Sequence, residues 1–475
     1  MRTTLTVIAL VGLTTTVAAA GRPAAVTQPT EIPGDWKWVS SPLPPLERIL
    51  ARERSERPIY GLYTWAGEYR THRDSIRTVG WRTVRVAGPM DDATMAMLAT
   101  DDMEVMMTVG LHGGSEKRNR TDFDSDEAFL DHYLEGLEAF VRTYGPGGSF
   151  FAAHPDVPKR PIRFIEVWNE PNFQYMIPPR EGVDRKVVEA EREALYAKVL
   201  PAACQRIKAV APEVGVVGFG AGGASLGDVR FIEHVHEATP AVATSYDVLS
   251  THPYIQPAPP EAFSIRGWGG YTIAGALARI RKVMNAAGAG DPPIWYTEVG
   301  WPISHADGGY FPTKAGEAMV DPLLQAAYVV RQYAYSMRLG IGRVMIMFAT
   351  DTDNFNGGFF LRDKSWRPGA YAVRTMIELM PHPKLKAALI DGTDGLFAYR
   401  FEPAPDSAAD VVMAWNVAGP RKVHLPLREL ARRGVTHATV YDLFGHAGEV
   451  ELTGGNVEVE VGPCPVYIVP VMPGD

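Results

Sequence analysis

The sequence has little cysteine, no long run of charges of one sign, and no apolar run long enough to cross a bilayer comfortably. Its 475 residues include two cysteines, Cys204 and Cys464, which excludes the disulfide framework that holds small secreted domains together. Their wide separation in the sequence leaves a bond between them open. The formal net charge of -8 argues against nucleic acid or an anionic membrane as the main partner. The charge balance carries no information about neutral partners.

An apolar stretch lies near the N-terminus, over residues 5–17. It follows the positive charge of Arg2 and precedes three alanines at 18–20, which is the pattern of a signal peptide with its cleavage site. We therefore expect residues 1–20 to be a signal peptide, the mature protein to be secreted or periplasmic, and no segment to insert in a membrane. A buried N-terminal helix is the alternative interpretation.

The next segments predict an α/β fold. Residues 21–57 are rich in proline and charge and predict a linker with one short amphipathic helix. From Ile59 onward, short apolar runs alternate with stretches of helical period, which indicates repeated βα units and a parallel sheet. The predicted strands span 59–65, 83–87, 105–109, 163–168, 214–219, 248–253, 294–298 and 343–349, with helices such as 128–144, 187–210 and 322–339 between them. Eight such units predict a closed (β/α)8 TIM barrel over residues 58–382.

Residues 383–475 follow a different pattern. Short apolar strands are separated by Gly, Pro and Asp turns and span residues 411–417, 423–427, 439–443 and 457–461. Residues 457–461 alternate strictly between apolar and acidic side chains, which predicts a strand with one face in water. We expect a small C-terminal antiparallel β-sandwich packed on the barrel.

Two of the predicted barrel strands end in acids within dense motifs. The fourth leads into Trp-Asn-Glu-Pro-Asn at residues 168–172, which contains Asn169 and Glu170. The seventh leads into Thr-Glu-Val-Gly-Trp-Pro at residues 297–302, which contains Glu298. Active sites of (β/α)8 barrels lie where strands end and βα loops begin. Because acids directly after apolar strands are costly to desolvate, they need partners or a function.

Cleavage of a glycosidic bond is one such function. It requires an acid that protonates the leaving oxygen and a carboxylate on the opposite side of the anomeric carbon. At a separation of about 5.5 Å the carboxylate attacks directly and the configuration is retained. Repulsion of roughly 3 kcal/mol at that distance keeps one acid protonated while the other stays charged. Arg85, at the end of the second strand, is expected to hold the charged partner ionised.

These motifs resemble clan A of the glycoside hydrolases, whose members share the (β/α)8 fold and a retaining double displacement. The resemblance covers roughly residues 59–381. It implies that Glu170 is the acid/base and Glu298 the nucleophile, and that Asn169 touches the 2-hydroxyl of the sugar.

Further residues match positions of the clan. Arg85, in Val-Arg-Val at 84–86, matches the second-strand arginine. His252 and Tyr254, in Ser-Thr-His-Pro-Tyr at 250–254, match the sixth-strand pair, and the resemblance implies that the tyrosine contacts the nucleophile.

Within the clan, Glu166 and the Trp-Asn-Glu-Pro-Asn string look most like family 39, the β-xylosidases and their bacterial exopolysaccharide-cleaving relatives. Residues 300–302, Gly-Trp-Pro, look more like the β-glucanase and galactanase families. Phe348 stands near the eighth-strand position where many members carry a stacking Trp. We expect Trp301, Phe348 and His112, which follows the third strand, to bind substrate, although His112 is equally compatible with a hydrogen-bonded loop histidine.

Structural explanations compete with these functional ones. Glu170 and Glu298 could be buried acids neutralised by arginines of the barrel. For Glu166, which points inward by the same strand parity as Glu170, we expect this structural role, an internal charge paired with arginine.

Other motifs predict less. Residues 218–223 match G-x-G-x-x-G but do not follow the first strand of a dinucleotide-binding unit, and residues 223–227 match the G-x-S-x-G elbow of esterases within a loose Gly/Ala run. Residues 351–357 resemble a calcium loop but carry Phe355 and Arg362 at two ligand positions. His234 and His236 point to different helix faces. We expect no metal and no cofactor.

The sequence thus predicts an exported enzyme that hydrolyses a β-linked oligo- or polysaccharide by double displacement through a covalent glycosyl-enzyme. A non-catalytic carbohydrate-binding barrel and a serine esterase are the alternatives.

Overall fold

The structure is a computed structural model that describes residues 22–30, 36–110, 119–223, 226–264, 271–303, 319–352, 355–427 and 434–472. The predicted signal peptide and His112 lie outside the described residues. Among the helices of these ranges, none combines the length and the hydropathy needed to cross a membrane.

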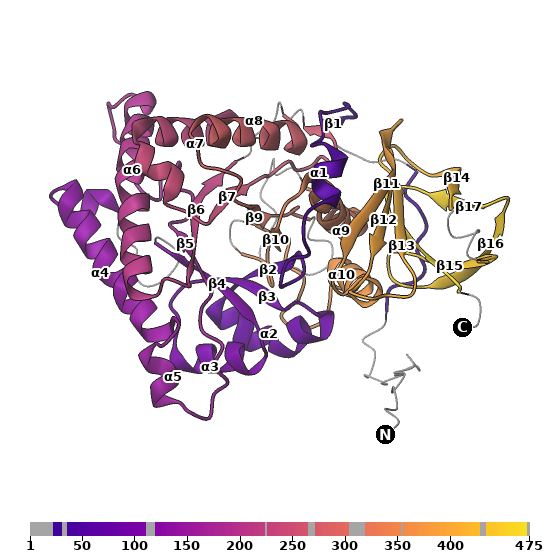
Figure 1. Cartoon of the computed structure of the whole chain (residues 1–475), viewed down its shortest axis with the longest axis horizontal. Coiled ribbons are helices and arrows are strands. Elements are labelled where there is room, and N and C mark those ends of the chain that lie inside the picture. Colours follow the sequence, from indigo (N-terminus) through magenta and orange to yellow (C-terminus); the bar gives the residue numbers. More distant parts are fainter. Residues whose placement is uncertain are drawn as a thin grey trace, which may run out of the picture.

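A closed barrel of eight parallel strands forms the larger part of the protein (Figure 1). The strands are β2 (Tyr60–Trp65), β3 (Thr83–Ala87), β4 (Glu104–Val109), β5 (Phe164–Val167), β6 (Gly215–Gly222), β7 (Val248–His252), β9 (Ile294–Val299) and β10 (Arg343–Ile346). They follow one another around the ring in chain order, and β10 closes it by pairing with both β9 and β2. Each overlaps a predicted strand, so the predicted (β/α)8 barrel is confirmed.

Helices cover the outside of the barrel. They are α2 (Ala66–Val79), α3 (Asp92–Thr100), α4 (Asp126–Tyr144), α5 (Ser149–Ala153), α6 (Arg185–Val210), α7 (Leu226–Ala238), α8 (Ile273–Ala286), α9 (Pro322–Leu339) and α10 (Pro368–Leu379), with short 3-10 helices at Arg120–Asp122 and Pro240–Thr244. Local signals start and stop them. The Asp321 carboxylate accepts from the Leu323 N–H at the start of α9, and Gly340 ends that helix with a φ of 75°.

The barrel interior is filled at the end opposite to the strand C-termini. Buried side chains of five barrel strands pack there, among them Met106, Val217, Val248, Trp295 and Met345. This packing closes the bottom of the barrel and leaves its other end, where the βα loops begin, to hold polar groups.

The C-terminal residues form an eight-stranded antiparallel sheet that folds into a sandwich. Its strands are β11 (Lys384–Thr393), β12 (Leu396–Glu402), β13 (Val411–Asn416), β14 (Arg421–Pro426), β15 (His437–Tyr441), β16 (Ala447–Thr453), β17 (Asn456–Val461) and β18 (Val466–Pro470). The predicted sandwich is confirmed. Its strands β11, β12, β16 and β18 escaped prediction. In β12 both faces are buried, one against the barrel core and one inside the sandwich, so its sequence shows no alternation.

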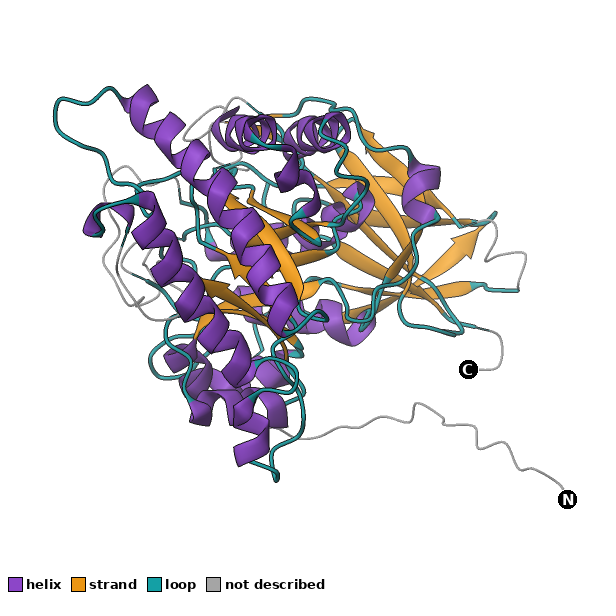
Figure 2. Cartoon of the chain, turned by 60° about the vertical axis from the view of Figure 1, so that its left-hand side comes forward, coloured by secondary structure: helices purple, strands orange, loops and turns teal. Residues whose placement is uncertain are grey.

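Helix α9 connects the two parts (Figure 1). Arg331 in its middle is fully buried and pairs with Glu261 through Nη2 and Oε2 at 2.5 Å. Its Nη1 donates to the carbonyl of Pro463 in the sandwich at 3.0 Å. Figure 2 shows the long helices packed around the barrel and the C-terminal strands gathered on the opposite side.

The segment before the barrel also contacts the sandwich. Gln28 exchanges two hydrogen bonds with the backbone of Cys464, at 2.8 and 3.0 Å. Further along this segment are β1 (Trp36–Lys37), which pairs with β8 (Phe263–Ser264), and the short helix α1 (Leu46–Leu50). Cys204 and Cys464 are both free thiols.

Candidate active site

Two glutamates come from β5 and the residues that directly follow it. Glu166 faces the barrel interior, like Phe164 two residues earlier, because alternate residues of a strand share a face. Trp168 and Glu170 have φ values of 70° and 45°, left-handed conformations that cost an L-residue roughly 1–2 kcal/mol each. This backbone lets Trp168 pack outward on Phe129 while Glu170 lines the cleft.

Glycines of β6 leave room for the two glutamates. A Cβ at Gly222 would lie 2.2 Å from Oε1 of Glu170, and one at Gly220 would lie 3.2 Å from Oε1 of Glu166. The Gly220 carbonyl also accepts the N–H of Glu170 at 3.0 Å. The glycine run of residues 218–223 therefore has a steric reason that involves no nucleotide.

A bulge in β9 directs Glu298 inward. Val344 of β10 pairs with Tyr296 of β9, and Ile346 pairs with Val299. Between these two pairs β10 has one residue and β9 has two, so β9 carries one extra residue. Such a bulge breaks the alternation of side-chain directions, so two neighbouring residues can face the same way. Thr297 contacts His252, and Glu298 contacts Arg85, both inside the barrel.

Arg85 of β3 connects the acids. Its Nη1 donates to Oε1 of Glu298 at 2.6 Å, its Nε to Oε2 of Glu166 at 2.8 Å, and its Nη2 to Oδ1 of Asn169 at 2.7 Å. The guanidinium also lies 4.3 Å from the ring centroid of Tyr63. A fully buried cation thus holds two carboxylates in fixed positions.

The structural role predicted for Glu166 fits its surroundings. Besides Arg85, its carboxylate accepts from Thr108 Oγ1 at 2.9 Å and from Ser250 Oγ at 3.0 Å. Glu166 has no exposed surface, so its charge is compensated entirely within the barrel.

Glu170 and Glu298 face each other across His252. The Nδ1 atom of His252 lies 3.0 Å from Oε1 of Glu170 and 3.6 Å from Oε2 of Glu298, and its Nε2 lies 3.1 Å from Oγ1 of Thr297. The Tyr254 hydroxyl donates to Oε2 of Glu298 at 2.8 Å. One oxygen of each carboxylate lies within 4.8 Å of the other. The two groups are therefore close enough to act on the two sides of one atom.

Their surroundings push the two pKa values apart. Burial raises the pKa of Glu170, and the nearby charge of Glu298 raises it further against the hydrogen bond with His252. Burial would also raise the pKa of Glu298, but His252, Arg85 and the Tyr254 hydroxyl outweigh it and hold that pKa below its ordinary value. Glu170 is thus the protonated member of the pair and Glu298 the charged one.

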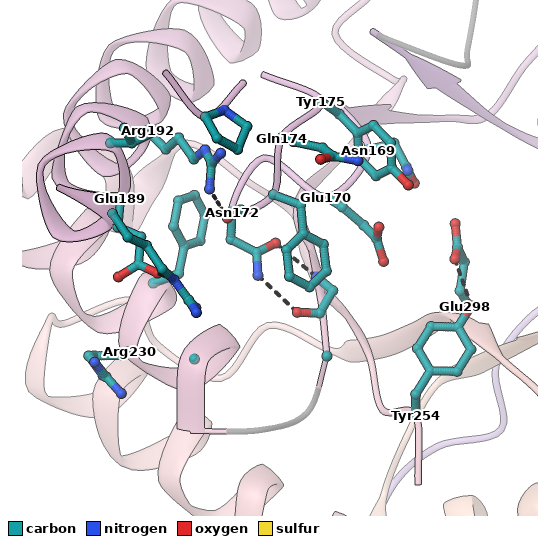
Figure 3. A pocket seen from close by; sticks show the side chains of 18 of the residues that line it. Asn169, Glu170, Asn172, Gln174, Tyr175, Glu189, Arg192, Arg230, Tyr254 and Glu298 are labelled. Atoms are coloured by element: carbon teal, nitrogen blue, oxygen red, sulfur yellow. Dashed lines mark hydrogen bonds and ion pairs between the residues drawn. The ribbon is translucent and has the colours of Figure 1, made fainter. Parts of the chain in front are cut away.

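Both carboxyl groups open into a cleft of about 1550 Å³ (Figure 3). This is larger than the roughly 300–1,000 Å³ typical of a site for one small molecule. Asn169, Tyr254 and Phe348, three of the predicted substrate-binding residues, line it. Arg85 and His252 are fully buried behind Glu170 and Glu298, so they act on the acids and not on the cleft surface.

Trp301 does not fit its predicted role, and this prediction is corrected. It is fully buried, donates its indole N–H to the carbonyl of Ala258 at 2.8 Å and packs edge-on against Tyr328 of α9. Trp301, which follows β9, therefore fills the core between the barrel and α9 and does not face the cleft.

Two aromatic residues of the cleft were not predicted from the sequence. Tyr63 and Trp65 stand at the end of β2 and line the cleft. Their two-residue spacing at a strand terminus was a usable signal, because side chains two apart share a face.

Glu170, His252 and Glu298 form the one group of acidic, His or Cys side chains in the described part of the chain that is close enough to hold a metal ion. Arg85 already places a positive charge on Glu298, which opposes a second cation there.

Residues of the calcium-like, histidine and esterase-like motifs have ordinary partners or lie outside the described residues. Asp351 pairs with Arg367 at 2.6 Å, and His234 pairs with Glu193 at 3.0 Å. Ser225, the serine of the esterase-like elbow, lies outside the described residues.

Comparison with known proteins gives structural likeness only. No model of a known protein family matches the chain, and no curated protein matches its sequence. Among solved structures, a family 39 glycoside hydrolase from the gut symbiont Bacteroides cellulosilyticus WH2 is similar, with a TM-score of 0.64 and 19% identity, covering 88% of this chain and 81% of that one.

Two further structures are similar in fold. The family 39 enzyme from Xanthomonas axonopodis pv. citri has a TM-score of 0.52 and 13% identity, over 88% of this chain and 96% of its own. A family 51 α-L-arabinofuranosidase from Bifidobacterium longum has a TM-score of 0.58 and 11% identity, over 87% and 96%. At such identities the likeness shows a shared fold, the (β/α)8 barrel of these glycoside hydrolases.

Proposed function

We propose that this protein is a retaining glycoside hydrolase of clan A that cleaves a β-linked oligo- or polysaccharide. Glu298 is the nucleophile and Glu170 the acid/base. The observation that carries the proposal is the close pair of carboxyl groups with opposed pKa shifts at the bottom of an open cleft. Retaining glycosidases hold their carboxyl groups about 5–5.5 Å apart, and inverting ones about 6.5–9.5 Å. Two oxygens within 4.8 Å support the retaining mechanism.

The first step joins the sugar to the protein. A carboxylate oxygen of Glu298 attacks the anomeric carbon while protonated Glu170 gives its proton to the departing glycosidic oxygen. Arg85 and Tyr254 hold the two oxygens of Glu298 and so fix its orientation before attack. Asn169 has its side-chain oxygen engaged by Arg85, which leaves its NH2 group to donate to the sugar 2-hydroxyl.

The second step releases the sugar. Glu170 has given its proton to the leaving group, and once Glu298 is esterified it no longer repels the charge of Glu170, although burial still raises that pKa. Ionised Glu170 accepts a proton from water, the water oxygen bonds to the anomeric carbon from the side the leaving group vacated, and the bond between that carbon and Glu298 breaks to return the Glu298 carboxylate. Two inversions at one carbon restore the starting configuration.

The surroundings of the acids support a carbohydrate as the substrate. Trp65, Phe173 and Tyr175 line the cleft and offer the flat apolar faces on which sugar rings stack. The similar solved structures are named as glycoside hydrolases, which agrees with this reading of the cleft.

The site would be tested by incubating the protein with a panel of β-linked polysaccharides and aryl β-glycosides and identifying the products. Cleavage by the wild type and loss of it in Glu298→Gln is the expected result. A 2-deoxy-2-fluoro glycoside of the sugar that is cleaved should then label Glu298, as read by peptide mass spectrometry. A panel without any cleavage, or a label on another residue, would count against the proposal.

We also propose that the enzyme is exported and acts in the periplasm or outside the cell, on the basis of the signal-peptide pattern of residues 1–20. N-terminal sequencing of the mature protein should begin near Gly21. An intact Met1 on a cytoplasmic protein would contradict this.

A further inference from the structure

The cleft extends well beyond the two catalytic acids. In Figure 3, Glu298 and Tyr254 lie at one side, Glu189, Arg192 and Arg230 lie at the other, and Glu170 stands between them. We call the far part the outer cleft and define it by the lining residues within 183–193 and 227–231, from the loop before α6 and the starts of α6 and α7.

Positive charge without a carboxylate partner gathers in the outer cleft. Its ionisable lining residues are Asp184, Arg185, Lys186, Glu189, Arg192, Glu193 and Arg230. Glu189 pairs with Arg185 at 2.6 Å, and Glu193 with His234 at 3.0 Å. Within the described ranges, Lys186, Arg192 and Arg230 have no carboxylate at ion-pair distance. In a chain of net charge -8, this local excess of cations calls for an explanation.

Among the outer-cleft cations without an ion-pair partner in the described ranges, Arg192 is the most buried, at 7% exposure. Its Nε and Nη2 donate to the carbonyl of Ile177 at 2.8 and 2.6 Å, and its Nη1 donates to the carbonyl of Asn172 at 3.1 Å. These bonds satisfy its polarity, but Glu189 acts on its charge only from beyond ion-pair distance, which leaves a buried cation without a direct carboxylate partner. Burial lowers the pKa of Arg192 accordingly. An anion bound in the cleft would supply the missing charge.

Arg230 adds a second cation at a favourable place. It is exposed and stands in the first turn and a half of α7, three residues after Gly227, which also lines the cleft. Residues three apart lie on one face of a helix, so Arg230 and Gly227 line the same part of the cleft. Because the Asp228 carboxylate already accepts the N–H of Val229 in the first turn of α7, an anionic group at this point would meet the guanidinium and not the helix start.

The position of the outer cleft relative to the acids says which part of a substrate it receives. An acid that protonates a glycosidic oxygen must lie on the side of the leaving group. Because the outer cleft continues beyond Glu170 and away from Glu298, it receives the leaving-group half of the chain. This step rests on the roles given to the two acids under the proposed function.

We infer that the outer cleft binds an anionic sugar on the leaving-group side, so that the substrate is a polysaccharide that carries carboxylate or sulfate groups. Arg230 and Lys186 contact the anionic group, and Arg192 supplies long-range attraction from its buried position.

Binding can be tested apart from cleavage by affinity electrophoresis in gels that contain one of three polymers with the same β-1,4-glucan backbone. They are hydroxyethyl cellulose, which is neutral, C6-oxidised cellulose, which carries carboxylates, and cellulose sulfate. A protein of net charge -8 is repelled by polyanions in general, so retardation by the charged gels reports a specific site. We expect the carboxylate or the sulfate gel to retard the wild type more than the neutral gel, and the stronger of the two identifies the anionic group.

The double variant Lys186→Gln/Arg230→Gln should weaken retardation roughly three- to tenfold in apparent dissociation constant, as expected for the loss of two exposed charge contacts. Lys282→Gln/Arg421→Gln is the matched control, because it removes one lysine and one arginine that are exposed and do not line the cleft. Retardation of the control should equal that of the wild type.

The inference is overturned if the charged gels do not retard the wild type beyond the neutral one, or if the double variant behaves like the control. A protein that cleaves only neutral glycans would fail the inference and leave the proposed function standing. Charge-dependent retardation in a protein that cleaves no glycan would support the anionic site and contradict the proposed function.

Discussion

The Tyr254 hydroxyl donates to Oε2 of Glu298 at 2.8 Å, on the oxygen that Arg85 leaves free. Each oxygen of the proposed nucleophile is thus held by a different donor, and both bonds favour the charged carboxylate. The arrangement keeps Glu298 ionised although it is only 6% exposed.

Removing this hydroxyl should therefore change both rate and pH dependence. In Tyr254→Phe we expect kcat to fall roughly 10- to 100-fold, the range for loss of a hydrogen bond to a charged group. Because the pKa of Glu298 would rise, the acidic limb of kcat/KM should move to higher pH. Tyr271→Phe is the control, since the buried Tyr271 hydroxyl has no hydrogen-bond partner in the described structure. An unmoved acidic limb would argue against Glu298 as the charged group.

Replacing each of the three glutamates by Gln should have different effects on activity and on the free energy of unfolding. Glu170→Gln and Glu298→Gln should both abolish cleavage of a natural substrate. Glu170→Gln should lower the free energy of unfolding by less than about 1 kcal/mol, and Glu298→Gln should lower it by more than Glu170→Gln does, because it breaks the buried pair with Arg85. Glu166→Gln should lower it by about 3–5 kcal/mol, because it breaks a fully buried pair with Arg85. Urea denaturation and product analysis measure the two effects. Active Gln variants, or equal destabilisation in all three, would contradict this assignment.

The pH profile of the wild type should be bell-shaped. Activity needs Glu298 charged and Glu170 protonated, so kcat/KM should fall as pH drops through the lowered pKa of Glu298 and as it rises through the raised pKa of Glu170. In Glu170→Ala, an aryl glycoside whose leaving group needs no proton should form the glycosyl-enzyme without the alkaline limb. A persisting alkaline limb in that variant would assign the limb to another group.

The stereochemical outcome follows from the spacing of the acids. With an oxygen of each within 4.8 Å, there is little space for a water between them, and the first product should keep the anomeric configuration of the substrate. Proton NMR of the product before mutarotation distinguishes the two anomers. If the opposite anomer appears first, Glu298 is not the nucleophile.

Glu68, which has no role in the proposed reaction, should make the free energy of unfolding depend on pH. Burial is the main cause that raises its pKa to about 7, against hydrogen bonds from Thr350 and from the N–H of Trp65. The folded state therefore binds more protons than the unfolded state between the ordinary carboxyl pKa and about 7, so stability should fall as pH rises through this window. The effect should be on the order of 1–3 kcal/mol, and Glu68→Gln should remove it in urea unfolding at pH 5 and pH 8. An equal pH dependence in the variant would show that other groups cause it.

The sequence by itself predicted the barrel strands, because each is a short apolar run bounded by helical stretches. Glu170 and Glu298 were also predictable, since acids at the ends of such strands need a reason to be there and strand ends meet at one face of a barrel. The inward direction of Glu166 followed from the two-residue period of a strand.

Tertiary structure decided the rest, because it depends on partners from distant strands. The clearance that Gly222 gives Glu170, the β9 bulge that turns Glu298 inward and the sharing of Arg85 between two carboxylates join residues that no local pattern connects. Trp301 was misread for the same reason. An aromatic residue beside a catalytic motif is equally suited to a sugar and to the core, and only the position of α9 determined that it packs against Tyr328.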